Sequence, residues 1–271
     1  MKTTKRLLVV FAAALVLLCS TGCAKLKARD HLNKGVQAFK NSKFEQAIDH
    51  FQQAVVLDPT LINARLYLAT ALAQQYIPGV DAPDNNRFAE QAIDQYKQVL
   101  QSDPKNINSI KGIAYLYLQM KKFPLAKEYY KKASELDPND PEPYYSVAVI
   151  DWTQTYVPRQ EERAKLGMKP DESLPAKDKK VCATLKEQNT PNVQEGIDNL
   201  NKALHLRPDY DDAMAYMNLM YRERADIQCD DPAARSEDLK TADEWVDKTM
   251  ATKKAKAEKQ PSGQIVVDQN K

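Results

Sequence analysis

The chain has 271 residues, of which 28% are charged and 43% hydrophobic, a composition typical of soluble globular proteins. It contains only 7 glycines, which argues against glycine-rich phosphate loops and hairpin-rich β architecture and favours helices. The formal charge of +2 becomes about −1 if three basic residues near the N-terminus are removed with a leader, since 39 − 3 = 36 basic side chains then face 37 acidic ones; this near-neutral body gives no reason to expect nucleic acid as a partner.

Residues 1–22 have the composition of a secretory signal peptide. Three basic residues among the first six precede an unbroken run of twelve apolar residues from Leu7 to Leu18. A helix needs about 20 apolar residues to span the roughly 30 Å core of a bilayer, so this run is too short. It has the length expected of the apolar part of an export signal.

The end of this segment, Ser20-Thr21-Gly22-Cys23, resembles a bacterial lipobox. The resemblance implies that Cys23 is lipidated, becomes the new N-terminus and anchors the protein, with residues 23–27 as a linker. Ser20 departs from the motif, which usually has leucine there; the alternative is an ordinary signal cleaved near Gly22, leaving a free thiol. Ala24 replaces the aspartate that retains lipoproteins in the inner membrane of enteric bacteria, so we expect an outer-membrane protein facing the periplasm.

A pattern of small and large residues recurs along the rest of the chain. In each copy a small residue is followed by an aromatic residue or leucine four places later, by another small or apolar residue three places further, and then by a proline. The copies are Ala47, Phe51, Ala54 and Pro59; Ala92, Tyr96, Val99 and Pro104; Ala126, Tyr130, Ala133 and Pro138; and Gly196, Leu200, Ala203 and Pro208. This spacing places the three residues on one helix face, and the proline ends the helix.

The proline spacing resembles that of the tetratricopeptide repeat, a helix-turn-helix unit of 34 residues. Pro104 to Pro138 is 34 residues, Pro59 to Pro104 is 45 = 34 + 11, and Pro138 to Pro208 is 70 = 34 + 36. The resemblance implies an all-α fold, namely a right-handed superhelical array (α-solenoid) of about five units over residues 28–256, with insertions near 77–87, 157–191 and 227–235. Residues 257–271 are expected to form a flexible tail.

Each second helix of the array is expected to follow a first helix. The expected core positions of first helices are Leu68, Ala69 and Leu72; Ile113, Ala114 and Tyr117; Val147, Ala148 and Trp152; and Met214, Met217 and Tyr221. The last second helix is expected from Glu237 to Lys256, with Ala242 and Val246 inward. Two insertions open with Tyr76-Ile77-Pro78 and Tyr156-Val157-Pro158, where we expect the proline to end the helix.

Cys182 and Cys229 lie in the insertions of consecutive repeats. Equivalent insertions of stacked repeats should be neighbours, and an exported protein meets an oxidising compartment. We therefore expect a disulfide between them, with two free packed thiols as the alternative.

The sequence offers no motif for catalysis. It lacks His-Glu-x-x-His, Cys-x-x-Cys, a glycine-flanked nucleophilic serine and a phosphate-cradling loop, so we expect neither enzymatic activity nor a cofactor. His31, His50 and His205 are interpreted as solvated or capping residues, and no metal site is expected. Met214, Met217 and Met220 have the softness of copper ligands, but the first two occupy core positions, which favours packing.

The repeat resemblance implies that first helices line a concave groove that binds an extended peptide or a partner helix. The corresponding positions are Leu32, Val36, Phe39, Leu66, Thr70, Gln74, Lys111, Tyr115, Gln119, Tyr145, Val149, Trp152, Leu219, Arg222 and Glu223. Leu32 and Val36 replace the residues with which chaperone-type members clamp a terminal carboxylate. The alternative is that the insertions cover these positions.

The sequence therefore indicates a lipid-anchored scaffold that binds other proteins or peptides of the cell envelope. A second hypothesis is a periplasmic protein that binds a small ligand or a metal through the region of Trp152 and the long insertion.

Overall fold

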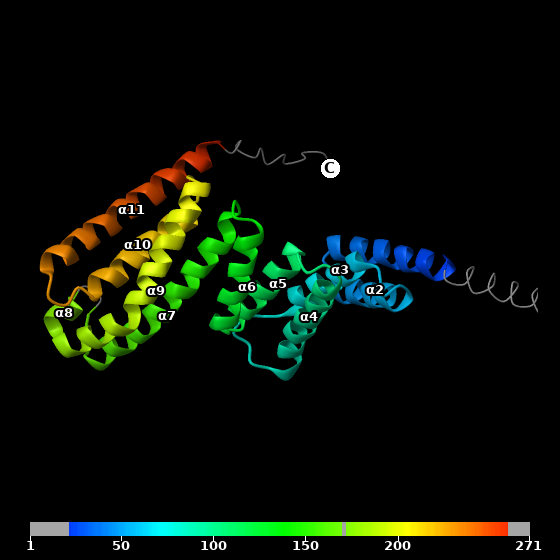
Figure 1. Cartoon of the computed structure of the whole chain (residues 1–271), viewed down its shortest axis with the longest axis horizontal. Helices are drawn as coiled ribbons and strands as arrows, with labels where there is room; N and C mark the ends of the chain where they lie inside the picture. The colour runs from blue at the N-terminus through cyan, green and yellow to red at the C-terminus, as the bar shows by residue number, and fades with distance from the viewer. Residues whose placement is uncertain (1–21, 170–171, 260–271) are drawn as a thin grey trace, which may run out of the picture. The chain divides into compact units, whose positions relative to one another are not determined.

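The helices of the chain pair into successive helix-turn-helix units in the computed structural model (Figure 1). The structure describes residues 22–169 and 172–259, and within these ranges it contains helices, turns and loops but no strand. The chain divides into two units, Met1–Leu136 and Asp137–Lys271, and each is described by itself. The expected signal peptide, 1–21, and most of the expected tail lie outside the described residues.

Over its described residues, 22–136, the first unit holds three helix pairs. Residues 22–40 form a helix that pairs with α2, Phe44–Leu57; the other two pairs are α3, Ile62–Gln75, with α4, Pro83–Ser102, and α5, Ile107–Gln119, with α6, Phe123–Leu136. Consecutive helices from α2 to α6 pack against one another, and α3 also contacts α5. First helices of neighbouring pairs therefore lie next to each other.

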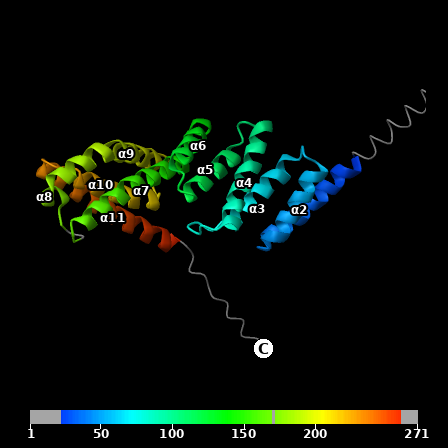
Figure 2. The same cartoon turned by 90° about the horizontal axis from the view of Figure 1, so that it is seen from below.

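In the second unit, residues 137–169 and 172–259 are described, and they hold two longer pairs. The helices are α7, Pro141–Lys165, the short α8, Leu174–Lys177, α9, Lys179–Leu206, α10, Asp211–Asp226, and α11, Pro232–Lys259. Helix α7 packs against α9 and α10, α9 against α10, and α10 against α11, while α8 lies on α9 (Figure 2).

Two turns within the helix pairs of the first unit have the same backbone geometry. Ser42 and Lys121 both adopt left-handed conformations, with φ of 57° and 56°. The amide of the residue that follows each donates to a carbonyl five residues earlier, that of Ala38 at 2.9 Å and that of Tyr117 at 2.8 Å. This bond is the 6→1 bond of a Schellman motif, which closes a helix C-terminus.

The four prolines of the sequence pattern lie in equivalent turns between the pairs. In each turn the carbonyl of the residue before the proline accepts a hydrogen bond from the amide two residues after it, at 3.0, 3.1, 3.3 and 3.1 Å along the chain. The fixed φ of proline suits the second position of such a turn. The turn at Pro208 therefore has the same geometry as the other three.

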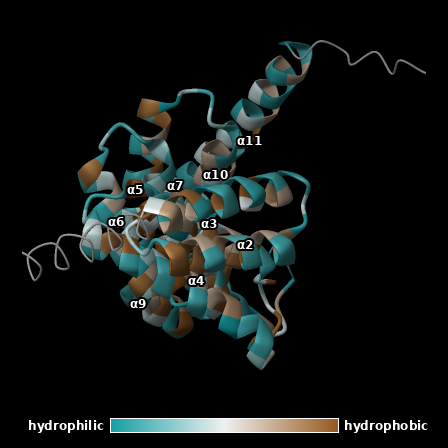
Figure 3. Cartoon of the chain, turned by 90° about the vertical axis from the view of Figure 1, so that its right-hand side faces the viewer, coloured by the Kyte–Doolittle hydropathy of each residue, from teal (hydrophilic) through white to brown (hydrophobic). Residues whose placement is uncertain are grey.

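The repeated small and large residues form the core, as predicted. Those of the second helices are buried: Ala47, Phe51, Ala54, Ala92, Tyr96, Val99, Ala126, Tyr130, Ala133, Gly196, Leu200 and Ala203. Met214, Met217 and Met220 are also buried, which agrees with packing rather than a ligand stripe. Hydrophobic and hydrophilic residues are interspersed along the helices (Figure 3), and the buried hydrophobic ones form the packed faces.

Gly196 stands where the other three copies of the pattern have an alanine, and the packing explains why. A Cβ atom at this position would lie 1.8 Å from Cε of Met220, which is fully buried in α10. The methionine side chain therefore occupies the space of the missing methyl group.

The prediction for Pro158 is wrong. Helix α3 ends at Gln75, just before Tyr76-Ile77-Pro78, as expected, but α7 continues through Pro158 to Lys165. Proline removes one helical hydrogen bond, and we attribute the continuation to the ion pairs that the following turns of α7 make with α10. Much of the expected 157–191 insertion is therefore helical. It contains the C-terminal part of α7, the short α8 and the N-terminal part of α9.

Smaller differences concern the other insertions and the last helix. The loops are confined to residues 76–82 and 227–231, because α4 and α11 begin at prolines, which suit the first turn of a helix. In α11, Ala242 is buried as predicted, but Val246 is 38% exposed and does not face inward. Residues 23–27 and 257–259 are helical.

Cys182 and Cys229 form a disulfide, with Cα atoms 5.7 Å apart. The bond joins the first turn of α9 to the loop between α10 and α11. Both cysteines are buried. The expected bond is therefore present and ties together two segments 47 residues apart in the sequence.

Candidate functional site

In the first unit, the expected groove positions are accessible to different degrees. The Tyr115 side chain of α5 is 50% exposed. Phe39 packs against Phe44 with ring centroids 5.3 Å apart, and Thr70 bonds the Tyr96 hydroxyl at 3.2 Å. The remaining half-buried positions are Leu32, Val36, Leu66, Lys111 and Gln119, and Gln74 is exposed. Tyr115 is therefore the aromatic residue of this row that is open to a partner.

In the second unit, the expected groove aromatics pack against other rings. Tyr145 lies 4.9 Å from Tyr210 and 5.5 Å from Tyr216, and Trp152 lies 5.5 Å from Tyr216 and 4.6 Å from Tyr156, centroid to centroid. Burial, with a contribution from Tyr216, raises the pKa of Tyr145. Tyr145 and Trp152 are therefore half-buried, and the Tyr216 ring of α10 contacts both of them.

Beside this aromatic cluster lies a hollow of about 460 Å³ between α7 and α10, here called the α7–α10 hollow. Its lining residues are Trp152, Tyr156, Arg159, Gln160, Arg163, Ala164, Met168, Leu219, Arg222 and Glu223. Four of these were expected groove positions: Trp152, Leu219, Arg222 and Glu223. Val149 is half-buried one turn earlier on α7. The fold thus brings first-helix positions of the last two repeats together around one concave surface.

The other lining residues were not predicted, because the sequence pattern indicates a helix end at Pro158. Tyr156, Arg159 and Arg163 follow Trp152 at intervals of four, three and four residues, which places all of them on one helix face. This spacing was the available signal. It indicates a shared helix face only if α7 continues past Pro158 to Lys165, as it does in the structure.

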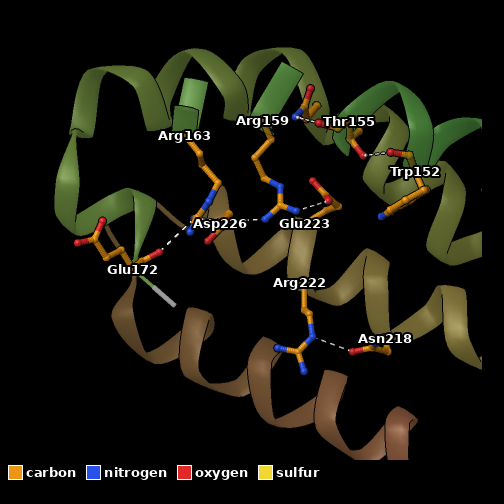
Figure 4. A network of polar contacts seen from close by, with 10 residues as sticks. Trp152, Thr155, Arg159, Arg163, Glu172, Asn218, Arg222, Glu223 and Asp226 are labelled. Atoms are coloured by element: carbon orange, nitrogen blue, oxygen red, sulfur yellow. Dashed lines mark hydrogen bonds and ion pairs between the residues drawn. The ribbon is translucent and has the colours of Figure 1, made fainter. Parts of the chain in front are cut away.

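A buried ionic network forms one wall of the hollow (Figure 4). From α7, Arg159 pairs with Glu223 at 2.8 Å and with Asp226 at 2.6 Å, and Arg163 pairs with Asp226 at 3.3 Å. The side chains of Glu223 and Asp226 are 1% and 8% exposed. The expectation that Glu223 lies open in the groove is therefore corrected: it is held beneath Arg159, and the network clamps the extension of α7 onto α10.

Arg163 also organises the loop after α7. Its guanidinium donates to the carbonyl of Lys169 at 2.6 Å and to the carbonyl of Glu172 at 3.0 Å. Glu172 in turn accepts a bond from the amide of Lys169 at 2.9 Å. The loop that contributes Met168 to the hollow is thus held by a side chain of the helix before it.

Arg222 lies at the more open side of the hollow. Its Nε donates to Asn218 at 2.8 Å and its Nη2 pairs with Asp243 of α11 at 2.7 Å. The side chain is 42% exposed. The hollow therefore combines an apolar, aromatic wall with two guanidinium groups, that of the mostly buried Arg159 and that of the more exposed Arg222. Such a lining suits a ligand that has both apolar and polar groups.

Burial raises the pKa of Glu223 to about 7, with Asp226 adding to the rise and Arg159 opposing it. The folded state then binds more protons than the unfolded chain between pH ~4.5 and ~7, so the contribution of this carboxyl to stability falls as the pH rises through that window.

Replacing Glu223 by Gln, which resembles the neutral acid, is expected to flatten this part of the pH profile. The measurement is denaturant unfolding of parent and variant at intervals between pH 4.5 and 8. Parallel pH profiles of the two proteins would rule out a titrating Glu223.

Cys23, the expected lipidation site, is exposed at the start of the helix over residues 22–40. Within the described ranges, none of the helices combines the length and the apolarity needed to cross a membrane. Over the same ranges, no group of three or more His, Cys, Asp and Glu side chains is arranged to hold a metal ion.

Comparisons with known proteins bear on the fold. Residues 89–150 match a family model described as tetratricopeptide repeat, and no curated protein matches the chain. Among solved structures, a MamA protein aligns at 12% identity and TM-score 0.57, over 87% of this chain and 97% of that one. The chain has the fold of a tetratricopeptide-repeat protein.

Two other tetratricopeptide-repeat structures are similar. MamA from Desulfovibrio magneticus RS-1 aligns at 16% identity and TM-score 0.56, over 84% of this chain and 96% of that one. YrrB, described as a TPR protein with an unusual peptide-binding site, aligns at 14% identity and TM-score 0.50, over 84% and 90%. At these identities the likeness concerns the fold alone.

Proposed function

We propose that the chain is a lipid-anchored tetratricopeptide-repeat scaffold of the bacterial cell envelope that binds other proteins or peptides. Its anchor would be Cys23, and its place the outer membrane, facing the periplasm. The anchor rests on the sequence pattern before Cys23 and on the exposure of that residue. The binding role rests on the repeat fold and on the likeness to YrrB, a tetratricopeptide-repeat protein that is described as having a peptide-binding site.

The observation that carries the binding role is that first-helix positions remain accessible in each unit. In the first, half of the Tyr115 side chain is exposed. In the second, the partly exposed positions Trp152, Leu219 and Arg222 line the α7–α10 hollow, whose volume of about 460 Å³ lies within the range of about 300–1,000 Å³ common to ligand pockets. Aromatic and arginine side chains at such positions are the residues that contribute most to binding energy at protein interfaces.

Tyr115→Ala is expected to weaken binding of a partner recovered with the membrane-tethered protein by about 1–3 kcal/mol, as for other interface aromatics. The stability of the free protein should change little, since the ring is half exposed. The measurements are a pull-down titration and a denaturant melt on the same variant.

Tyr117, two residues further along α5 and only 8% exposed, is the matched control. Tyr117→Ala is expected to cost about 3–5 kcal/mol of stability, as core aromatics do. Equal destabilisation by the two substitutions, or unchanged partner binding by Tyr115→Ala, would contradict the role given to Tyr115.

The anchor has its own test. The parent protein is expected to fractionate with membranes and to incorporate labelled fatty acid, because the acyl chains bury apolar surface worth about 0.8 kcal/mol per CH₂. Cys23→Ala should abolish both the label and the membrane association. Persistent labelling of that variant would refute lipidation at Cys23.

A further inference from the structure

Two of the three histidines of the chain, far apart in sequence, meet in the first repeat. The Nδ1 atoms of His31, in the helix over residues 22–40, and His50, in α2, are 3.3 Å apart. The ring centroids are 5.5 Å apart and the ring planes are inclined by 48°. Both side chains are half-buried. The sequence alone suggests separate solvated or capping residues, whereas the structure places them in contact.

Core packing holds this pair in place. One turn after His31, Gly35 lies against the ring of Phe51, the residue after His50: a Cβ atom on the glycine would be 2.4 Å from that ring. Phe51 is fully buried. The helix over residues 22–40 and α2 therefore pack closely within one turn of His31 and next to His50.

The spacing matches that of two ligands of one tetrahedral metal ion. Zinc binds histidine nitrogen at about 2.0–2.1 Å in tetrahedral geometry, which places two ligand nitrogens about 3.3–3.4 Å apart. Adjacent ligands at right angles, as in square-planar or octahedral sites, would be about 2.8–3.0 Å apart at the same bond length. The observed distance of 3.3 Å corresponds to the tetrahedral edge.

We propose that His31 and His50 form a two-histidine zinc site in the first repeat, with water or a ligand atom of a bound partner in the remaining positions. The described residues contain no cluster of three or more His, Cys, Asp and Glu side chains, so the protein itself supplies two ligands. Asp30, the residue before His31, is not available as a third ligand in this arrangement, because its carboxylate accepts a hydrogen bond from Lys34 at 2.7 Å.

Zinc binding requires a change of tautomer in one ring. In the metal-free pair one imidazole carries its proton on Nδ1 and donates it to Nδ1 of the other. Zinc needs the lone pair of both Nδ1 atoms, so the donor ring must carry its proton on Nε2 instead. The bound ion would then cross-link the two helices of the first repeat, and binding to the folded state alone would stabilise it.

The test is a calorimetric titration of the full-length protein with Zn²⁺ alone. We expect one zinc ion per chain, and we expect His31→Ala and His50→Ala each to weaken its binding by at least about tenfold, since even second-shell changes cost about 10–100-fold. The matched controls remove the other candidate ligands: His205→Ala, which alters an exposed histidine of the second unit, and Cys23→Ala. Both should bind zinc as the parent does.

Thermal melts provide the second measurement. Zinc should raise the Tm of the parent and of the His205→Ala variant, but not that of His31→Gln or His50→Gln, which keep a polar side chain if the alanine variants fold poorly. Unchanged zinc affinity in both His31→Ala and His50→Ala, loss of binding only in Cys23→Ala, or no zinc uptake by the parent would each overturn the proposal.

Discussion

Arg159→Ala is expected to lower the free energy of unfolding by about 3–5 kcal/mol, the usual cost of removing one partner from a buried ion pair. The guanidinium pairs with Glu223 at 2.8 Å and with Asp226 at 2.6 Å. Without it, two nearly buried carboxyl groups lose a shared counter-charge, and Asp226 keeps only the longer contact with Arg163. Denaturant unfolding followed by circular dichroism measures the loss.

Arg222→Ala is the matched control for that experiment. Arg222 lies across the same hollow, but its side chain is 42% exposed and its partner Asp243 is 71% exposed. Exposed pairs contribute about 0–1 kcal/mol, so this variant should remain close to the parent. Equal losses in the two variants would mean that general packing, and not a buried counter-charge, explains the effect of Arg159.

Removal of the disulfide by the double substitution Cys182→Ala and Cys229→Ala is expected to lower stability by about 2–4 kcal/mol. The bond closes a loop between positions 47 residues apart, and the chain-entropy model gives roughly 4 kcal/mol for such a loop. The helical content should hardly change, because Cys182 lies in the first turn of α9 and Cys229 lies in the loop between α10 and α11. Melts of the parent with and without reductant should show the same difference.

The control for the disulfide is Cys23→Ala, which removes an exposed cysteine outside the bond and should leave the stability of the repeats unchanged. Mass spectrometry of the non-reduced protein should identify a peptide that links Cys182 to Cys229. Free alkylation of both thiols in denaturant without reductant would refute the bond.

The repeat fold was predictable because its signals are local. A small residue such as Ala47, a ring such as Phe51 four places later and Pro59 at the end of the unit together specify a helix, its packed face and its end. The four equivalent turns at the prolines confirm that interpretation. The disulfide was predictable for a related reason, since equivalent positions of stacked repeats lie near one another.

The α7–α10 hollow could not be predicted in full because it depends on contacts distant in sequence. Pro158 reads locally as the end of a helix, yet Arg159 pairs with residues 64 and 67 positions later, at Glu223 and Asp226, and the helix continues. The contact between His31 and His50 is of the same kind. Neither residue has a neighbour in sequence that indicates its partner, and only the packing of two helices brings them together.

The way in which Arg163 holds the loop after α7 has a consequence for the variation of this protein. The arginine binds the carbonyl oxygens of Lys169 and Glu172, and every residue type carries such an oxygen. Substitutions of the side chains at these two positions therefore leave both bonds available, while replacement of Arg163 removes them together. Related sequences are accordingly expected to diverge along this loop and to keep an arginine at the position of Arg163, where lysine, with its single ammonium group, cannot span two carbonyls in the same fixed geometry.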